Sequence, residues 1–138
     1  MLSINFIAVI IAALANFIIG FMFHGPLFGK LWMKLANIHP TGKEKISDMV
    51  PQMIKNFLVN IICAYVLAMF IYVTASYYNN VGNIVGGMGI AFWAWFGFIV
   101  TSTSIDVIWM GKSKKLWIFE IIASLVSFIV MGAILVIW

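Results

Sequence analysis

Four apolar runs dominate this sequence, and each is long enough to cross a lipid bilayer. They extend over about residues 4–23, 54–76, 84–108 and 116–138. Because an α-helix rises about 1.5 Å per residue, about 20 residues cross a hydrocarbon core of about 30 Å. Inside lipid, backbone polar groups must be paired within the segment, which favours helices. The runs therefore predict four transmembrane helices in a single domain over residues 1–138.

The composition excludes a water-soluble fold. Of the 138 residues, 64% are hydrophobic and 9% are charged, whereas soluble domains carry about 25% charged residues. We therefore predict an all-α integral membrane protein. Its two histidines and single cysteine show no metal-ligand spacing, and we find no phosphate-binding loop or catalytic motif. We expect a protein that is not an enzyme and needs no metal or cofactor.

A short amphipathic helix is predicted directly after the first span, where Gly25-Pro26 breaks the chain. Over about residues 26–37, Lys30 and Lys34 point away from an apolar side formed by Leu27, Phe28, Leu31, Trp32 and Leu35. This pattern is typical of a helix lying in the membrane interface, with Trp32 at headgroup depth. Residues 38–50 are polar and predict a surface loop. The second span is expected to begin after Pro51, with Ser47 or Asp48 near its cap.

The lysines indicate the orientation of the chain. All eight lie between spans one and two, up to Lys55 at the start of span two, or between spans three and four, and the remaining connections and ends have none. Short loops rich in lysine remain cytoplasmic. We therefore expect a protein of the cell inner (cytoplasmic) membrane with cytoplasmic basic loops and both termini outside. Lys30, Lys34 and Trp32 are expected to contact anionic lipid headgroups rather than nucleic acid.

Small residues indicate how the helices pack. Ala8, Ala12, Asn16, Gly20 and His24 recur every fourth residue in the first span, a spacing that lets neighbouring helices approach closely. Similar stripes occur in the second span (Asn56, Asn60, Ala64 and Ala68) and in the third (Gly82, Gly86 and Gly87). We predict that Gly20 and the three glycines of the third span lie at helix contacts. Because these faces exceed what one four-helix chain needs, we also expect a homo-oligomer.

Polar side chains from all four spans gather at one predicted depth, in the half of the membrane next to the basic loops. They are Asn16, His24, Asn60, Asp106, Glu120 and Ser124. An ionisable group within a span indicates a functional site, so the first interpretation is a cytosol-open polar cavity that holds a cation or relays a proton. The alternative is that Glu120 and Asp106 pair with lysines of the 112–115 segment or reach the interface.

Other polar residues also allow two interpretations. His24 is either a titrating group that joins Glu120 or an interfacial residue that caps its helix. The hydroxyls of residues 101–104 form a binding site or bond to backbone carbonyls one turn earlier.

Three stretches resemble a known family. They are Gly25-Pro26-Leu27-Phe28-Gly29-Lys30-Leu31-Trp32-Met33, residues 89–98 (GIAFWAWFGF) and residues 131–138 (MGAILVIW). Together they resemble the bacterial membrane family known as domain of unknown function 1761. Two positions depart from its pattern: Phe23-His24 replaces a Trp-Tyr pair, and Glu120 replaces an asparagine. The resemblance implies a small four-span membrane protein without an assigned activity.

Two functions are compatible with these features. The first is movement of a small solute or ion through the cytosol-facing polar cavity. The second is a non-catalytic structural or accessory role, in which the protein binds anionic lipid or a partner helix.

Overall fold

A computed structural model of the chain describes residues 3–138, and within that range it contains helices and no strands. Met1 and Leu2, which the predicted domain includes, lie outside the described residues. The elements are α1 (Phe6–His24), α2 (Gly29–Leu35), α3 (Ile46–Tyr77), α4 (Ile84–Ala94), the π-helical segment η1 (Trp95–Val100), α5 (Thr101–Trp109) and α6 (Lys114–Ile137). Because α4, η1 and α5 follow one another without a break, they form one long helix.

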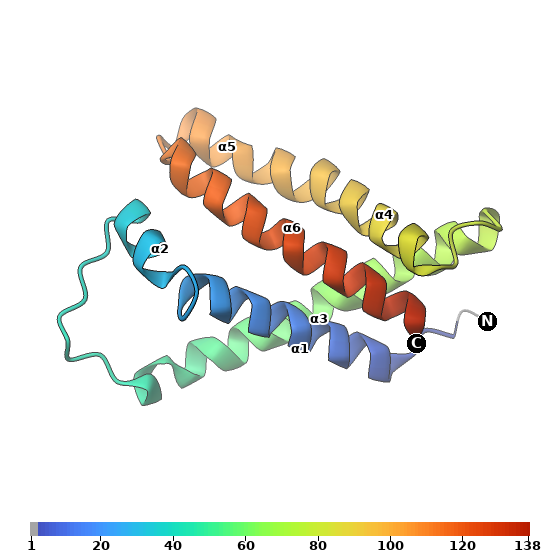
Figure 1. Cartoon of the computed structure of the whole chain (residues 1–138), viewed down its shortest axis with the longest axis horizontal. Helices are drawn as coiled ribbons and strands as arrows, with labels where there is room; N and C mark the ends of the chain where they lie inside the picture. Colours follow the sequence, from blue (N-terminus) through green and yellow to red (C-terminus); the bar gives the residue numbers. More distant parts are fainter. Residues whose placement is uncertain (1–2) are drawn as a thin grey trace.

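The four long helices confirm the predicted fold class. Phe6–His24, Ile46–Tyr77, Ile84–Trp109 and Lys114–Ile137 are each long and apolar enough to cross a membrane. They run up and down, so that α2, the segment leading to α3 and the turn between α5 and α6 lie at one end of the molecule (Figure 1). The two termini and the turn between α3 and α4 lie at the other. We call the first of these the basic end, because the lysine-rich segments meet there.

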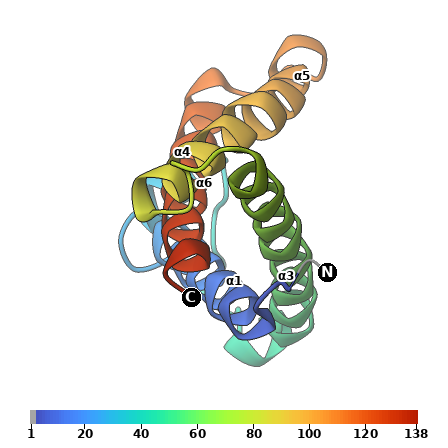
Figure 2. The same cartoon turned by 90° about the vertical axis from the view of Figure 1, so that its right-hand side faces the viewer.

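The helices are ordered α3, α1, α6, α4 around the molecule, so α1 and α6 are central (Figures 1 and 2). Small side chains fill the contact between α1 and α3: Ala12, Ala13 and Ala64 are completely buried. Because alanine projects only a methyl group, the two backbones approach closely, as membrane helices do in the absence of a hydrophobic driving force. The alanine stripes predicted on spans one and two thus meet each other.

One glycine pair joins α4 to α6. A Cβ atom added to Gly132 would lie 2.5 Å from the carbonyl oxygen of Gly87 and 2.7 Å from the Cβ of Ala91. Both glycines are buried, so the two backbones touch at this point. Gly87 therefore lies at a helix contact, where the sequence placed it.

The other three predicted packing glycines lie elsewhere. A Cβ added to Gly20 or Gly82 would meet nothing within 4 Å, so neither approaches another helix of this chain. Gly82 precedes α4 rather than belonging to it. At Gly86 the added atom would collide with the backbone of Val81, so this glycine allows a local turn rather than a helix contact. Four-residue spacing did not distinguish turns and open surfaces from helix contacts.

The interfacial helix is shorter than the sequence predicted. Helix α2 begins at Gly29 and not at Pro26. The backbone N–H of Leu27 donates to the Met22 carbonyl at 3.0 Å, and that of Gly29 donates to Gly25 at 2.9 Å. These bonds make residues 25–28 a tight turn that carries the chain out of α1. Pro26, which has no N–H to donate, fits that turn.

Helix α3 begins earlier than predicted. It starts at Ile46, after the uncapped Lys45, and contains Pro51, so the last residues of the expected 38–50 loop are helical. Neither Ser47 nor Asp48 is the cap. Proline near a helix start removes one backbone hydrogen bond, to the carbonyl four residues earlier, and the helix tolerates this loss. The extension adds about two turns to α3 at the basic end.

Candidate binding groove

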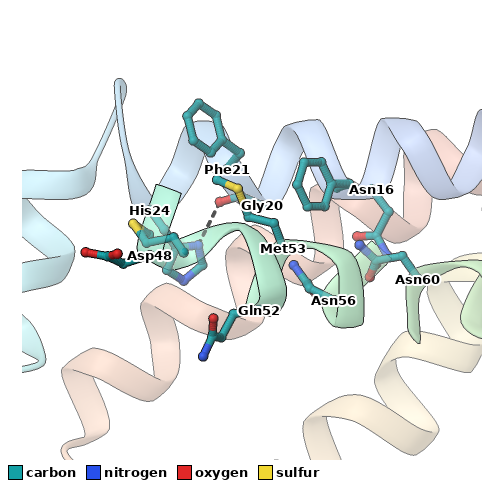
Figure 3. Close-up of a pocket in the computed structure, with 11 residues that line it drawn as sticks. Asn16, Gly20, Phe21, His24, Asp48, Gln52, Met53, Asn56 and Asn60 are labelled. Atoms are coloured by element: carbon teal, nitrogen blue, oxygen red, sulfur yellow. Dashed lines mark hydrogen bonds between the residues drawn. The ribbon is translucent and has the colours of Figure 1, made fainter. Parts of the chain in front are cut away.

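A groove lined by both polar and apolar side chains runs between α1 and α3 at the basic end of the molecule (Figure 3). Its volume is about 640 Å³, within the range of small-molecule sites. It is lined by Asn16, Phe17, Gly20, Phe21 and His24 from α1 and by Asp48, Met49, Gln52, Met53, Asn56 and Asn60 from α3. The polar members recur every four residues on α3 and lie eight residues apart on α1, which keeps them on one side of each helix. Gly20 leaves space for the groove at its centre.

The groove ends at a pair of asparagines. The side-chain Nδ2 of Asn16 donates to Oδ1 of Asn60 at 3.1 Å. Asn16 lies eight residues before His24, so the pair is about 12 Å along the helix from the end of α1. Beyond it, Ala12 and Ala64 close the contact between the helices completely. The groove is therefore accessible from the basic end and closed towards the other end.

His24 connects the groove to α2 and α6. Its Nδ1 lies 2.8 Å from the carbonyl oxygen of Gly20, and this bond is drawn in Figure 3. Its ring packs edge-on against Trp32 of α2, with 5.0 Å between ring centroids, and against Phe119 of α6. His24 thus closes its own helix end, as one sequence interpretation held, and at the same time lines the groove. Its contacts are with Phe119 of α6 rather than with the neighbouring Glu120.

The predicted cavity residues do not share one cavity. Asn16, His24 and Asn60 line the groove, whereas Asp106, Glu120 and Ser124 do not. Side chains at similar depth face different neighbours, because α1 packs against both α3 and α6 and the groove lies on the side of α3. Depth along the membrane was predictable from sequence, but the angular position of each helix was not.

The polar residues of α6 are satisfied by neighbouring groups. Glu120 forms an ion pair with Lys112, which is the alternative that the sequence left open. Ser124 accepts a hydrogen bond from the indole Nε1 of Trp95 at 2.9 Å, and the same N–H reaches the Ile121 carbonyl at 3.1 Å. Asp106 is exposed. The contacts of Glu120 and Ser124 hold α6 against the third span and the turn that follows it, rather than forming a binding site.

The hydroxyls of residues 101–104 bond to the backbone, as one of the two interpretations proposed. Thr103 donates to the Ile99 carbonyl at 2.7 Å, and Ser104 donates to the Thr101 carbonyl at 2.7 Å. The Thr103 oxygen also accepts from the indole N–H of Trp117 at 2.9 Å. Because its hydroxyl both donates and accepts a hydrogen bond within the protein, Thr103 contributes to the packing of α5 against α6.

Part of the groove was missed from sequence. Asp48 and Gln52 continue the predicted spacing of Asn56 and Asn60 towards the basic end, and this regular interval was the available signal. It was overlooked because Pro51 was expected to precede the helix. The lysines predicted to contact headgroups, Lys30 and Lys34, are exposed on α2.

The segment before α3 carries a local hydrogen-bonded turn. The backbone N–H and the hydroxyl of Thr41 donate to Oε1 of Glu44 at 2.7 and 2.9 Å. Bonds to the ionised carboxylate favour its charged form, and the backbone bond from Thr41 is the main reason why the pKa of Glu44 lies below its usual value. Glu44 therefore stays ionised among the lysines of this end.

The fold and the groove define a small multi-pass α-helical membrane protein. The model of a family described as "Protein of unknown function (DUF1761)" matches residues 7–136, nearly the whole chain. The chain belongs to this family, as the resemblance of its proline turn and third span indicated. No curated protein and no solved structure matches it. The family description assigns no activity, so function has to be argued from the groove.

Proposed function

We propose that this protein binds a small polar solute or ion in the groove between α1 and α3 and moves it across the membrane. The observation that supports this proposal is the one-sided shape of the groove. Polar side chains line it from the basic end down to the Asn16–Asn60 pair, and the buried alanines lie beyond. Polar groups within a span are costly unless they are paired or wetted, and a solute pathway explains why they are retained.

The orientation follows from the lysines. Since lysine-rich short loops remain in the cytoplasm, the groove would open to the cytosol and both termini would lie outside. A carrier in this state is open inward, and the contact of Ala12 and Ala64 is its closed outer part. Release on the other side requires α1 and α3 to separate at the alanines. Binding and passage need no covalent chemistry, so we do not propose catalysis.

Gly20→Leu is expected to reduce solute flux at least about tenfold, because the new side chain fills the groove. It has room to do so, since a Cβ at Gly20 meets nothing within 4 Å. The measurement is uptake into proteoliposomes, with a pH-sensitive dye for protons and light scattering for urea, glycerol and choline chloride. Gly89→Leu is the matched control, because Gly89 has the same open space on α4 and lies outside the groove.

Two results would contradict the transport proposal. One is flux no greater than in protein-free vesicles for every probe. The other is an equal loss of flux in the Gly20→Leu and Gly89→Leu variants, which would indicate a general effect on the fold rather than obstruction of the groove.

The second candidate function is binding of anionic lipid at the basic end. It is favoured by α2, which leaves Lys30 and Lys34 exposed while Trp32 packs against His24. A lysine near an anionic surface contributes about 1 kcal/mol of attraction. We expect Lys30→Gln with Lys34→Gln to lower the retention of phosphatidylglycerol relative to phosphatidylcholine several-fold, measured by native mass spectrometry.

The control for lipid binding replaces Lys43 and Lys45, which lie outside α2, in the same way. Equal losses in the two double variants would indicate unspecific attraction to the basic end. In that case α2 would have no special role in binding lipid.

A further inference from the structure

The groove has an unbalanced set of charges. Among the described residues that line it, Asp48 carries the one permanent charge at neutral pH, and no lysine takes part. The lysines of the basic end lie outside this lining, on α2, before and within α3, and at the turn and start of α6. Asp48 is therefore the charged side chain that a ligand in the groove meets directly among these lining residues.

His24 adds a second acceptor. Because a carbonyl oxygen only accepts, the bond between Nδ1 and the Gly20 carbonyl requires the proton on Nδ1. The other ring nitrogen, Nε2, then carries a lone pair when the ring is neutral. The imidazole lies between the two helices on the side of Asp48 and Gln52 (Figure 3). The Asp48 carboxylate and a neutral His24 ring thus both offer acceptors at the mouth of the groove.

The deeper lining is amphipathic. Asn56 and Gln52 offer amide oxygens, which also accept. Phe17, Phe21, Met49 and Met53 form the apolar part of the wall, and aromatic faces attract cations. A bare metal ion or an inorganic anion would leave this apolar area without a partner.

We propose that the ligand of the groove is a small organic cation of the alkylammonium class, with Asp48 as its countercharge and the apolar wall against its alkyl groups. The inference rests on the proposed function and adds the chemical class of the solute. The carboxylate at the mouth would attract the charge, and the amide oxygens would receive it along the groove. The Asn16–Asn60 pair marks the deepest position that the cation reaches before α1 and α3 separate.

The test compares three molecules of almost identical shape: choline, its uncharged isostere 3,3-dimethylbutan-1-ol, and the anion 3,3-dimethylbutanoate. Binding to the full chain in phosphatidylcholine nanodiscs is measured by equilibrium dialysis at neutral pH. We expect saturable choline binding and much weaker binding of the other two. Asp48→Asn should weaken choline binding about fivefold, in line with a partly exposed charge pair. Asp106→Asn, an exposed carboxylate outside the groove, should leave it unchanged.

Two outcomes would overturn the assignment. If the alcohol or the anion binds as tightly as choline and Asp48→Asn has no effect, the ligand is not a cation. Loss of that binding in Gly20→Leu would still support the groove as a solute site. If none of the three binds to a folded protein, verified by circular dichroism, the alkylammonium class is wrong. The flux comparison of Gly20→Leu with Gly89→Leu then decides separately whether the groove conducts.

Discussion

Replacing Gly132 by valine is expected to separate α4 from α6 and to destabilise the protein by about 3 kcal/mol, the upper part of the range for overpacked sites. The reason is the close approach at this position. An added Cβ would lie 2.5 Å from the Gly87 carbonyl oxygen and 2.7 Å from the Ala91 Cβ. The first neighbour is backbone, so a rotamer change cannot relieve the collision and the helices have to move apart. The measurement is the unfolding free energy in detergent micelles.

Gly89→Val is the control for this prediction. It also places a β-branched side chain in the glycine-rich part of α4, but into open space. It should leave stability within about 0.5 kcal/mol of the wild type, as surface changes do. Equal destabilisation by both variants would mean that the flexibility of glycine, rather than the contact between α4 and α6, stabilises the native state.

Most of the fold was predictable because bilayer crossing is a strong constraint. Four apolar runs of about 20 residues or more leave little choice other than four helices. The positions of the lysines also predict correctly that both basic segments lie at the same end. The helix starts were less predictable from the prolines. Pro51 lies inside α3 rather than before it, and Pro26 lies in the hydrogen-bonded turn that precedes α2.

The site was predictable only in part. Four-residue spacing correctly grouped Asn16 with Gly20 and His24, and Asn56 with Asn60. Spacing does not reveal which helix a row of residues faces, and so Glu120, which pairs with Lys112, was grouped with residues that line the groove between α1 and α3. The ion pair of Glu120 with Lys112 depends on how the turn between α5 and α6 folds, which the spacing within one helix does not show. Residues spaced every four positions therefore predict a helix contact and a groove equally well.

The π-helical segment was not predicted at all. Residues Trp95–Val100 follow α4 without proline, and their glycine, Gly97, has open space around it. Such segments insert an extra residue into a helix and change the direction of the side chains that follow. Here the segment begins at Trp95, which is 8% exposed, whereas Trp93, two residues earlier, is 68% exposed. Aromatic composition alone did not distinguish the two tryptophans.

Trp95→Ala is expected to destabilise the protein by about 3 kcal/mol, within the range for removing a buried aromatic side chain. Two effects add. Loss of the buried ring leaves a cavity between η1 and α6, and the indole N–H no longer donates to the Ser124 hydroxyl and the Ile121 carbonyl. Trp95→Phe should reduce the unfolding free energy much less, because phenylalanine keeps most of the packing. It removes only the hydrogen bonds, which contribute on average about 0.6 kcal/mol each within membranes. Both values come from unfolding in micelles.

Trp93→Ala provides the matched comparison, because Trp93 lies on the same helix and exposes most of its ring. Its replacement removes contacts that lipid replaces, so stability should change little. If Trp93→Ala and Trp95→Ala were equally destabilising, burial against α6 would not be what distinguishes the two positions. If Trp95→Phe were as damaging as Trp95→Ala, the bonds to Ser124 and Ile121 rather than the ring would determine the packing of α6. The three variants together separate packing from hydrogen bonding at the start of the π-helical segment.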